Sequence, residues 1–231
     1  MTDQHRFKQR LFFRFFKNFR LGKWAQYFHL EREAIENVIP KIDLKPRNIK
    51  NLKTLLDREE LLRNMPPNKV IAEIGVDNGN FSEQIVRITH PQKLHLIDAW
   101  AENTRYHIGL KNVVEDKFRK EIDEGKLELN VGFSDKVLTG FPDQYFDWVY
   151  LDTDHTYQTT KIELNILKSK VKTGGIIAGH DYIIGNWVSG YRYGVIEAVH
   201  EFCVNEDWEI IFLTSETDQY RSFAINKISG Y

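Results

Sequence analysis

The chain has 231 residues, of which 42% are hydrophobic and 28% are charged, and its formal net charge is −1. These values fit one α/β domain with a sizeable core and exclude a disordered chain and a disulfide-rich scaffold. A single cysteine permits no internal disulfide, which favours a reducing compartment. No apolar run approaches the roughly 20 residues that span a bilayer, and no signal peptide is visible, so we expect a cytoplasmic protein.

The amino-terminal segment, residues 1–30, is basic and aromatic. Seven Lys and Arg stand against one Asp, a net charge of +6 that leaves −7 for the remainder. On a helix, the aromatic side chains would share one face and the basic ones another: Phe12, Phe15, Phe16 and Phe19 against Arg10, Arg14 and Lys17. Such a helix fits packing on the domain, a contact in a homo-oligomer, or peripheral attachment of residues 6–28 to the inner membrane surface. The acidic remainder offers no basic track for a phosphate backbone, so no nucleic-acid partner is expected.

The chain is expected to form a helical extension over residues 1–65 and one α/β domain over residues 66–231. In the extension, an amphipathic helix is predicted over residues 52–62. From residue 66 strands and helices alternate. The predicted strands are 70–74, 94–97, 127–131, 148–151, 176–178, 208–213 and 222–226, and the predicted helices are 80–88, 111–124, 159–171 and 195–204.

This order predicts a doubly wound, Rossmann-like sheet of seven strands. The first five strands alternate with helices and should therefore be parallel. The last two are joined by a short polar link, residues 214–221, and should form an antiparallel hairpin.

A glycine-rich turn follows the first predicted strand, in the sequence VIAEIGVDNGNFS (residues 70–82). Gly75 and Gly79 permit a tight turn and close approach of a ligand to the backbone. The next strand ends at Asp98, where an acid is well placed to accept hydrogen bonds from ribose hydroxyls. The pattern predicts a cofactor that contains a nucleoside.

Charge indicates which cofactor this is. Asp77 stands where a dinucleotide site has its second glycine, and Glu73 precedes the turn. These carboxylates would repel a pyrophosphate, whereas a sulfonium or ammonium at ~4 Å would gain about 4 kcal/mol at an effective dielectric constant near 20. The turn therefore favours S-adenosylmethionine over NAD.

Acids and histidines follow two further strands. Asp152 and His155 come after the strand 148–151, and His180 and Asp181 come after the strand 176–178. Parallel strands bring these residues to one edge of the sheet, where such sheets bind ligands. The aspartates suit a hard divalent cation such as Mg²⁺, and either histidine can act as a general base.

The residues around these clusters have a functional and a structural interpretation each. Asp154 belongs either to the site or to an N-cap before a helix at Thr156, and Tyr157 belongs either to the site or to the packed interior. A loop with four large polar or aromatic side chains fits either a substrate wall or an ordinary surface: Asn186, Trp187, Tyr191 and Tyr193.

Over residues 66–228 the chain resembles the class I S-adenosylmethionine-dependent methyltransferases. The resemblance is carried by the E-x-G-x-x-x-G turn with the later acid Asp98. The motifs LDTDHTY, GGIIAGHDY and GVIEAVHEF narrow it to bacterial O-methyltransferases related to macrolide-sugar and cephamycin enzymes, and more distantly to catechol O-methyltransferases.

The resemblance implies specific contacts. The residues it implies for the cofactor are Glu73, Gly75, Asp77, Gly79, Asn80, Asp98, Ala99, Trp100, Ser134, Asp135 and Asp152, with Ala99 and Trp100 flanking the adenine. For a metal it implies Asp152, His180 and Asp181, and for catalysis His180, His155 and Asp152. In the catechol group a carboxylate stands at the position of His180, so this residue is either a metal ligand or the base, or the metal is not Mg²⁺.

The sequence thus predicts an S-adenosylmethionine-dependent, metal-assisted O-methyltransferase acting on a small-molecule hydroxyl, with a sugar favoured. A catechol or phenol methyltransferase, a non-catalytic subunit with the cofactor fold, and a NAD-dependent sugar oxidoreductase stay open as alternatives.

Overall fold

The computed structural model describes residues 30, 33–100, 109–186, 189–217 and 220–228. The chain divides into two compact units, residues 1–40 and 41–231. In the first unit residues 33–38 are helical, and the predictions for the basic aromatic segment lie outside the described residues. Among the described helices, none combines the length and apolar character needed to cross a membrane.

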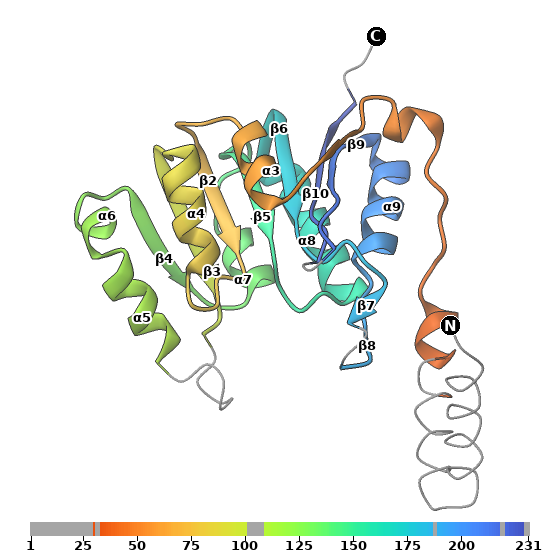
Figure 1. The fold of residues 1–231 in the computed structure, drawn as a ribbon, viewed down its shortest axis with the longest axis horizontal. Coiled ribbons are helices and arrows are strands. Elements are labelled where there is room, and N and C mark those ends of the chain that lie inside the picture. The colour runs from red at the N-terminus through yellow and green to blue at the C-terminus, as the bar shows by residue number, and fades with distance from the viewer. Residues whose placement is uncertain (1–29, 31–32, 101–108, 187–188, 218–219, 229–231) are drawn as a thin grey trace, which may run out of the picture. The chain divides into compact units, whose positions relative to one another are not determined.

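The second unit is built on an eight-stranded sheet (Figure 1). In sheet order its strands are β1 (Lys53–Leu55), β9 (Trp208–Thr214), β10 (Phe223–Lys227), β6 (Val171–Gly179), β5 (Phe146–Leu151), β2 (Val70–Ile74), β3 (Lys93–Asp98) and β4 (Leu127–Val131). β10 runs antiparallel to both of its neighbours, and the other paired strands are parallel. The predicted Rossmann-like sheet with a terminal antiparallel hairpin is confirmed.

The predicted number of seven strands is wrong, because β1 pairs in parallel with β9 and adds an eighth. The predicted helix over residues 52–62 is wrong in its first half for the same reason. The Asp57 side chain accepts a hydrogen bond from the Glu60 amide at 2.7 Å, which caps helix α3 (Arg58–Asn64) and leaves the preceding residues extended. The division at residue 40 also differs from the predicted boundary at residue 65, since residues 41–65 supply a strand and a helix to the sheet unit.

Helices cover both faces of the sheet (Figure 1). They are α3, α4 (Asn80–Thr89), α5 (Leu110–Lys117), α6 (Arg119–Asp123), α7 (Ser134–Thr139), α8 (Tyr157–Lys170) and α9 (Val195–Glu206), with a short 3₁₀ helix at Pro46–Ile49. α7, α8 and α9 pack into one apolar cluster, and α3, α4 and α5 pack into another on the opposite face.

β5 shows why its sequence is a continuous apolar run. Val149 and Leu151 belong to one cluster, and Trp148 and Tyr150 belong to the other, so both faces of the strand are buried.

Two helical predictions need correction. The expected helix over residues 111–124 is broken into α5 and α6 at Phe118, whose side chain is buried in the core at 3% exposure. The six-residue helix α7 was not predicted. A small hairpin of β7 (Gly185–Asn186) and β8 (Tyr191–Arg192) forms where a loop was expected.

The order of the strands positions the site. From β2 the chain runs outward through β3 and β4, and it then returns to β5 and β6 on the other side of β2. The chain therefore leaves β2 and β5 toward opposite edges of the sheet. The carboxyl ends of these two strands border the crevice where such sheets bind ligands.

Gly75 lies where these two loops meet. Its φ is +87°, and a Cβ atom there would lie 1.9 Å from the carbonyl oxygen of Asp152. Only glycine fits this close approach of two backbones.

Candidate functional site

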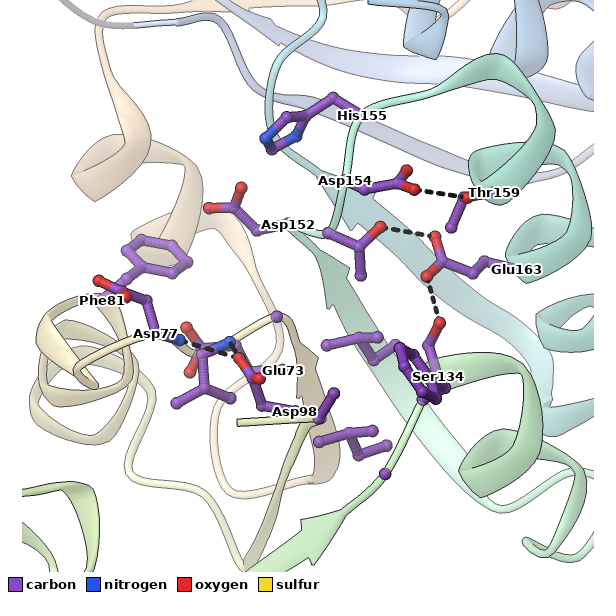
Figure 2. Close-up of a pocket in the computed structure, with 18 of the residues that line it drawn as sticks. Glu73, Asp77, Phe81, Asp98, Ser134, Asp152, Asp154, His155, Thr159 and Glu163 are labelled. Carbon is purple, nitrogen blue, oxygen red and sulfur yellow. Dashed lines mark hydrogen bonds between the residues drawn. The ribbon is translucent and has the colours of Figure 1, made fainter. Parts of the chain in front are cut away.

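A cavity of about 800 Å³ opens at the carboxyl ends of the strands (Figure 2). Its size falls within the range of small-molecule sites, roughly 300 to 1,000 Å³. The predicted cofactor residues that line it are Glu73, Gly75, Asp77, Asn80, Asp98, Ala99, Ser134, Asp135 and Asp152. His155 lies on the same wall. The structure thus brings most of the predicted cofactor residues and one predicted base to one cavity.

Asp98 organises the glycine turn. Its Oδ2 accepts hydrogen bonds from the amides of Val76 at 2.7 Å and Asp77 at 3.0 Å, and its Oδ1 accepts one from the amide of Trp100 at 2.7 Å. A carboxylate has about four lone-pair sites, so one stays available on Oδ1. Asp98 can therefore hold the turn and still accept a ribose hydroxyl.

Glu73 lies deeper, at 1% exposure, and the Ser82 hydroxyl donates a hydrogen bond to its Oε2. Burial raises the pKa of Glu73 to about 8, and the hydrogen bond from Ser82 opposes this only in part. At neutral pH the carboxyl group is mostly protonated until a cation lies beside it, because a cation favours the ionised form. The predicted attraction for a positively charged cofactor is thus coupled to loss of a proton.

Two predicted cofactor residues take structural positions instead. Trp100 is buried at 4% exposure, and its indole N–H donates to the Asp77 carbonyl at 3.0 Å, so it braces the turn from beneath. Gly79 is the N-cap of α4 with a φ of +75°, and its α-carbon faces Phe118. Neither is among the described residues that line the cavity. The sequence pattern could not separate residues that shape the turn from residues that face the ligand.

Several lining residues were not predicted: Arg58, Phe81, Phe133, Thr153, Thr159, Ile162 and Glu163. Glu163 is 1% exposed and lies between two hydroxyl donors, Ser134 at 2.6 Å and Thr153 at 3.0 Å (Figure 2). Burial raises its pKa to about 7. The one available signal was an acid beside the apolar positions of the predicted helix over residues 159–171.

On the acceptor side, two residues that line the cavity, Asp152 and His155, contact two that do not, His180 and Asp181. The Nδ1 atom of His155 lies 2.7 Å from Oδ2 of Asp181. The Nδ1 atom of His180 lies 3.6 Å from Oδ2 of Asp152 and 3.5 Å from Oδ2 of Asp181. The predicted juxtaposition of the two clusters is therefore present in the structure.

The two histidines differ in access. His155 lines the cavity and its side chain is 26% exposed, whereas the His180 side chain is 11% exposed and is not among the described lining residues. The Nε2 atom of His180 is buried with no hydrogen-bond partner in the described part of the chain. Although burial lowers it, the pKa of His180 is raised to about 9 by the nearby carboxylates of Asp152 and Asp181, which favour the protonated ring at neutral pH.

The backbone at His155 and Asp181 is left-handed. His155 has a φ of +62°, and its carbonyl accepts a hydrogen bond from the Gly194 amide at 2.8 Å. Asp181 has a φ of +57°. Left-handed backbone outside glycine costs of order 1 kcal/mol and concentrates at functional sites.

A divalent cation fits a neighbouring group of ligand atoms. Asp152, His155 and Asp181 each offer one atom, and these atoms lie within 4.8 Å of one another. Oδ1 of Asp181 is buried and has no hydrogen-bond partner among the described residues, as expected of an atom that awaits a ligand. This group has His155 where the sequence analysis expected His180.

Asp154 and Tyr157 support the helix rather than the cavity chemistry. The N-cap of α8 is Thr156, whose hydroxyl accepts from the Thr159 amide at 3.2 Å, so the predicted N-cap at Asp154 is displaced by two residues. Asp154 accepts hydrogen bonds from the amide of Thr156 and the hydroxyl of Thr159. The Tyr157 hydroxyl donates to Glu201 of α9.

Tyrosines stand beside the histidines. The ring of Tyr193 lies 4.7 Å from that of His155, and Tyr191 lies 5.7 Å from Tyr193. Tyr220, which was not predicted, lies 5.9 Å from Tyr193 and 6.3 Å from His180. Trp187 lies outside the described residues.

One segment of the chain matches a known protein family. Residues 72–182 match a family described as "Methyltransferase domain". No curated protein matches the sequence.

Solved structures resemble the domain in fold. The pyocyanin biosynthetic protein PhzM matches with a TM-score of 0.56 and 13% identity, over 74% of this chain and 54% of that protein. A putative rRNA methylase from Clostridium thermocellum matches with a TM-score of 0.54 and 15% identity, over 75% and 94% of the two chains. A putative methyltransferase from Streptococcus mutans in complex with SAH matches with a TM-score of 0.52 and 12% identity, over 74% and 95%.

The match thus spans about half the length of PhzM, and at these identities the likeness shows the fold alone. Together with the family match over residues 72–182, this fold supports the predicted superfamily of class I S-adenosylmethionine-dependent methyltransferases. The narrower group of sugar-modifying O-methyltransferases stays a prediction.

Proposed function

We propose that the protein is an S-adenosylmethionine-dependent O-methyltransferase that acts on a hydroxyl of a small molecule. The observation that carries this proposal is the position of the His155–Asp181 pair, 2.7 Å apart, at the cavity that the acidic glycine turn also lines. One wall can hold a cationic cofactor, and the other can take a proton from an acceptor.

The methyltransferase domain supports binding of the cofactor through charge and shape. When bound, S-adenosylmethionine supplies a methyl group on a positively charged sulfur, which an oxygen nucleophile displaces. Glu73 and Asp77 attract the sulfonium and the ammonium of the cofactor, and Asp98 accepts a hydrogen bond from a ribose hydroxyl. At another edge of the cavity, Phe133 (70% exposed) and Ile162 (40% exposed) offer apolar surface that a flat adenine ring would cover.

His155 is the proposed general base. Because its Nδ1 faces Asp181 as a hydrogen-bond donor, its Nε2 is the nitrogen that can accept the proton of a hydroxyl. Asp181 orients the ring and stabilises the imidazolium that forms. His180 is the weaker candidate, since its free nitrogen is buried away from the cavity.

A divalent cation would be held by Asp152, His155 and Asp181, or by the two aspartates with His155 left as the base. Such an ion lowers the pKa of a hydroxyl beside it and fixes its position. Both arrangements predict that chelation lowers turnover.

The acceptor class follows from the tyrosines beside His155 and His180. Aromatic faces stack on sugar rings, which supports a sugar hydroxyl as the acceptor. A phenol ring would pack on the same side chains, so a catechol-type acceptor is the second candidate.

Calorimetry with S-adenosylmethionine, S-adenosylhomocysteine and NAD tests the cofactor. We expect binding of the first two and not of NAD. Binding of NAD without binding of S-adenosylmethionine would refute the proposal.

Transfer of a labelled methyl group then tests the acceptor, with a panel of sugars, glycosides and catechols run in EDTA and in Mg²⁺. Turnover that needs Mg²⁺ supports a metal site at Asp152 and Asp181, with or without His155 as a ligand. Equal turnover in EDTA and in Mg²⁺ would support methyl transfer and would show that the reaction needs no metal. Methylation of catechols and of no sugar or glycoside would show that the acceptor is a phenol.

A further inference from the structure

The charge around the cavity is one-sided. Seven acidic residues are among its described lining residues: Glu73, Asp77, Asp98, Asp135, Asp152, Asp154 and Glu163. In the same described lining, Arg58 alone represents Lys and Arg. S-Adenosylmethionine carries a sulfonium and an ammonium that suit these acids, but it also carries a carboxylate that they would repel.

Arg58 is held at the cavity by its surroundings. It is the first residue of α3, directly after the N-cap Asp57, so the start of the helix fixes its backbone. Its guanidinium carbon lies 4.2 Å above the ring of Phe81, within the range of a cation–π contact. Its Nη1 lies 3.5 Å from Oδ2 of Asp152, and its side chain is 20% exposed.

These contacts, together with a hydrogen bond to Tyr150, orient Arg58 without using all of its donors. A guanidinium has five N–H donors in a planar fork, and a tight ion pair to a carboxylate has N···O distances of roughly 2.7 to 2.9 Å. The 3.5 Å separation from Asp152 is longer than that. A second carboxylate can therefore take a bidentate position on the outer edge of the fork.

We propose that Arg58 binds the α-carboxylate of the methionine part of S-adenosylmethionine. This inference rests on the proposed cofactor. Glu73 and Gly75, the predicted contacts of the methionine part, line the cavity together with Arg58. An ionised Glu73 carboxylate would also act on Arg58 across this part of the cavity. Once the cationic cofactor has ionised Glu73, Arg58 and Glu73 would present opposite charges to the two ends of a zwitterion.

The amino terminus of α4 is the rival position for the carboxylate. Gly79, its N-cap, has no side chain to cap the first amides, and such amides attract anions. Binding there would leave Arg58 with a structural role beside Asp152, Phe81 and Tyr150.

The experiment measures calorimetric affinities of wild type and Arg58→Met for four probes. S-Adenosylmethionine and S-adenosylhomocysteine carry the carboxylate, whereas decarboxylated S-adenosylmethionine and methylthioadenosine lack it. Arg63→Met is the matched control, because Arg63 lies on the same helix and pairs with Glu59 on the surface at 2.9 Å.

We expect Arg58→Met to weaken binding of the two carboxylate probes by roughly 10- to 100-fold, the effect of losing a charged hydrogen bond. The two other probes should change by less than about threefold under the same principle. Arg58→Lys should fall between wild type and Arg58→Met, because it keeps the charge and loses the fork. Arg63→Met should match wild type with each probe.

Equal weakening of all four probes would overturn the inference, since Arg58 would then act through Asp152 and Phe81. No change with any probe would also overturn it and would favour the terminus of α4. A wild-type protein that fails to bind S-adenosylmethionine at all would refute the proposed function itself, which is a separate result.

Discussion

The two halves of the cavity are built differently. In the cofactor half, Asp98 is fixed by three backbone amides from its own loop and from the adjacent glycine turn. In the acceptor half, His155, His180 and Asp181 are held mainly by one another, through side chains that come from the ends of two strands.

This difference predicts how strongly each half responds to side-chain substitutions. Backbone contacts survive most side-chain substitutions, so the cofactor half should lose affinity in small steps. A network of mutually dependent side chains loses its function when one member changes. The proposed function therefore predicts large effects on turnover in one half and graded effects on binding in the other.

The sharpest comparison is between the two histidines. We expect His155→Gln to lower methyl-transfer turnover by about 10²- to 10⁴-fold, the usual contribution of a general base. His180→Gln should cost less than about tenfold, because His180 acts on the reaction only by placing Asp152 and Asp181. Single-turnover rates at saturating S-adenosylmethionine check this.

The exposed His90 at the opposite end of α4 provides the control, as His90→Asn. A larger loss for His180→Gln than for His155→Gln would reverse the assignment of the base.

Asp181→Asn should lower turnover by about 100-fold while the affinity for S-adenosylmethionine changes by less than about twofold, because Asp181 orients the base and does not line the cofactor half. Rate and calorimetric measurements on one preparation check both parts. Asp143→Asn, at a surface ion pair with Lys170, is the control. A collapse of cofactor affinity in Asp181→Asn would show that this residue belongs to the other half.

Gly75 joins the halves, so its substitution should damage both. We expect Gly75→Ala to destabilise the fold by more than about 2 kcal/mol, because it combines left-handed strain with a clash against Asp152. Gly174→Ala isolates the strain: its φ is +77° and a Cβ there would meet nothing within 4 Å. Urea unfolding of the two variants measures the difference. An equal loss in the free energy of unfolding of both variants would mean that the clash with Asp152 does not destabilise the fold.

The smallest effect concerns the pH dependence of cofactor binding. Glu73, whose pKa is about 8, binds a proton at neutral pH and should release it when a cationic cofactor binds. Since the free protein then holds more protons than the complex, affinity should rise with pH, by up to about tenfold per unit below pH 8, and level off above it.

Glu73→Gln should bind more weakly and lose this dependence. Calorimetry from pH 6 to 9 in buffers of different ionisation enthalpy counts the proton directly. An unchanged slope in Glu73→Gln would assign the proton to another group.

Local patterns predicted most of the residues that line the cofactor half of the cavity. The strand at Val70–Ile74, the glycine turn and the acid at Asp98 are close in sequence, and their chemistry follows from charge and backbone freedom. The pattern failed for Trp100, since burial beneath the turn depends on packing against α5 and not on the motif.

The acceptor half could be predicted in composition but not in geometry. Two clusters at parallel strand ends had to meet, yet the sequence did not show which histidine faces the cavity. That depends on the left-handed backbone at His155 and Asp181 and on the hydrogen bond from Gly194. Arg58 was missed because α3 is brought to the cavity from a segment that the sequence pattern assigned to an extension.

By itself, the sequence determined the alternation of strands and helices, the hairpin at the end of the sheet and the acidic turn. These follow from hydrophobic period and local charge, which act between near neighbours. Only the tertiary structure decided the eighth strand, the burial of His180, the access of His155 and the entry of Arg58 into the cavity. Each of these depends on contacts between residues far apart in the chain, which local patterns do not record.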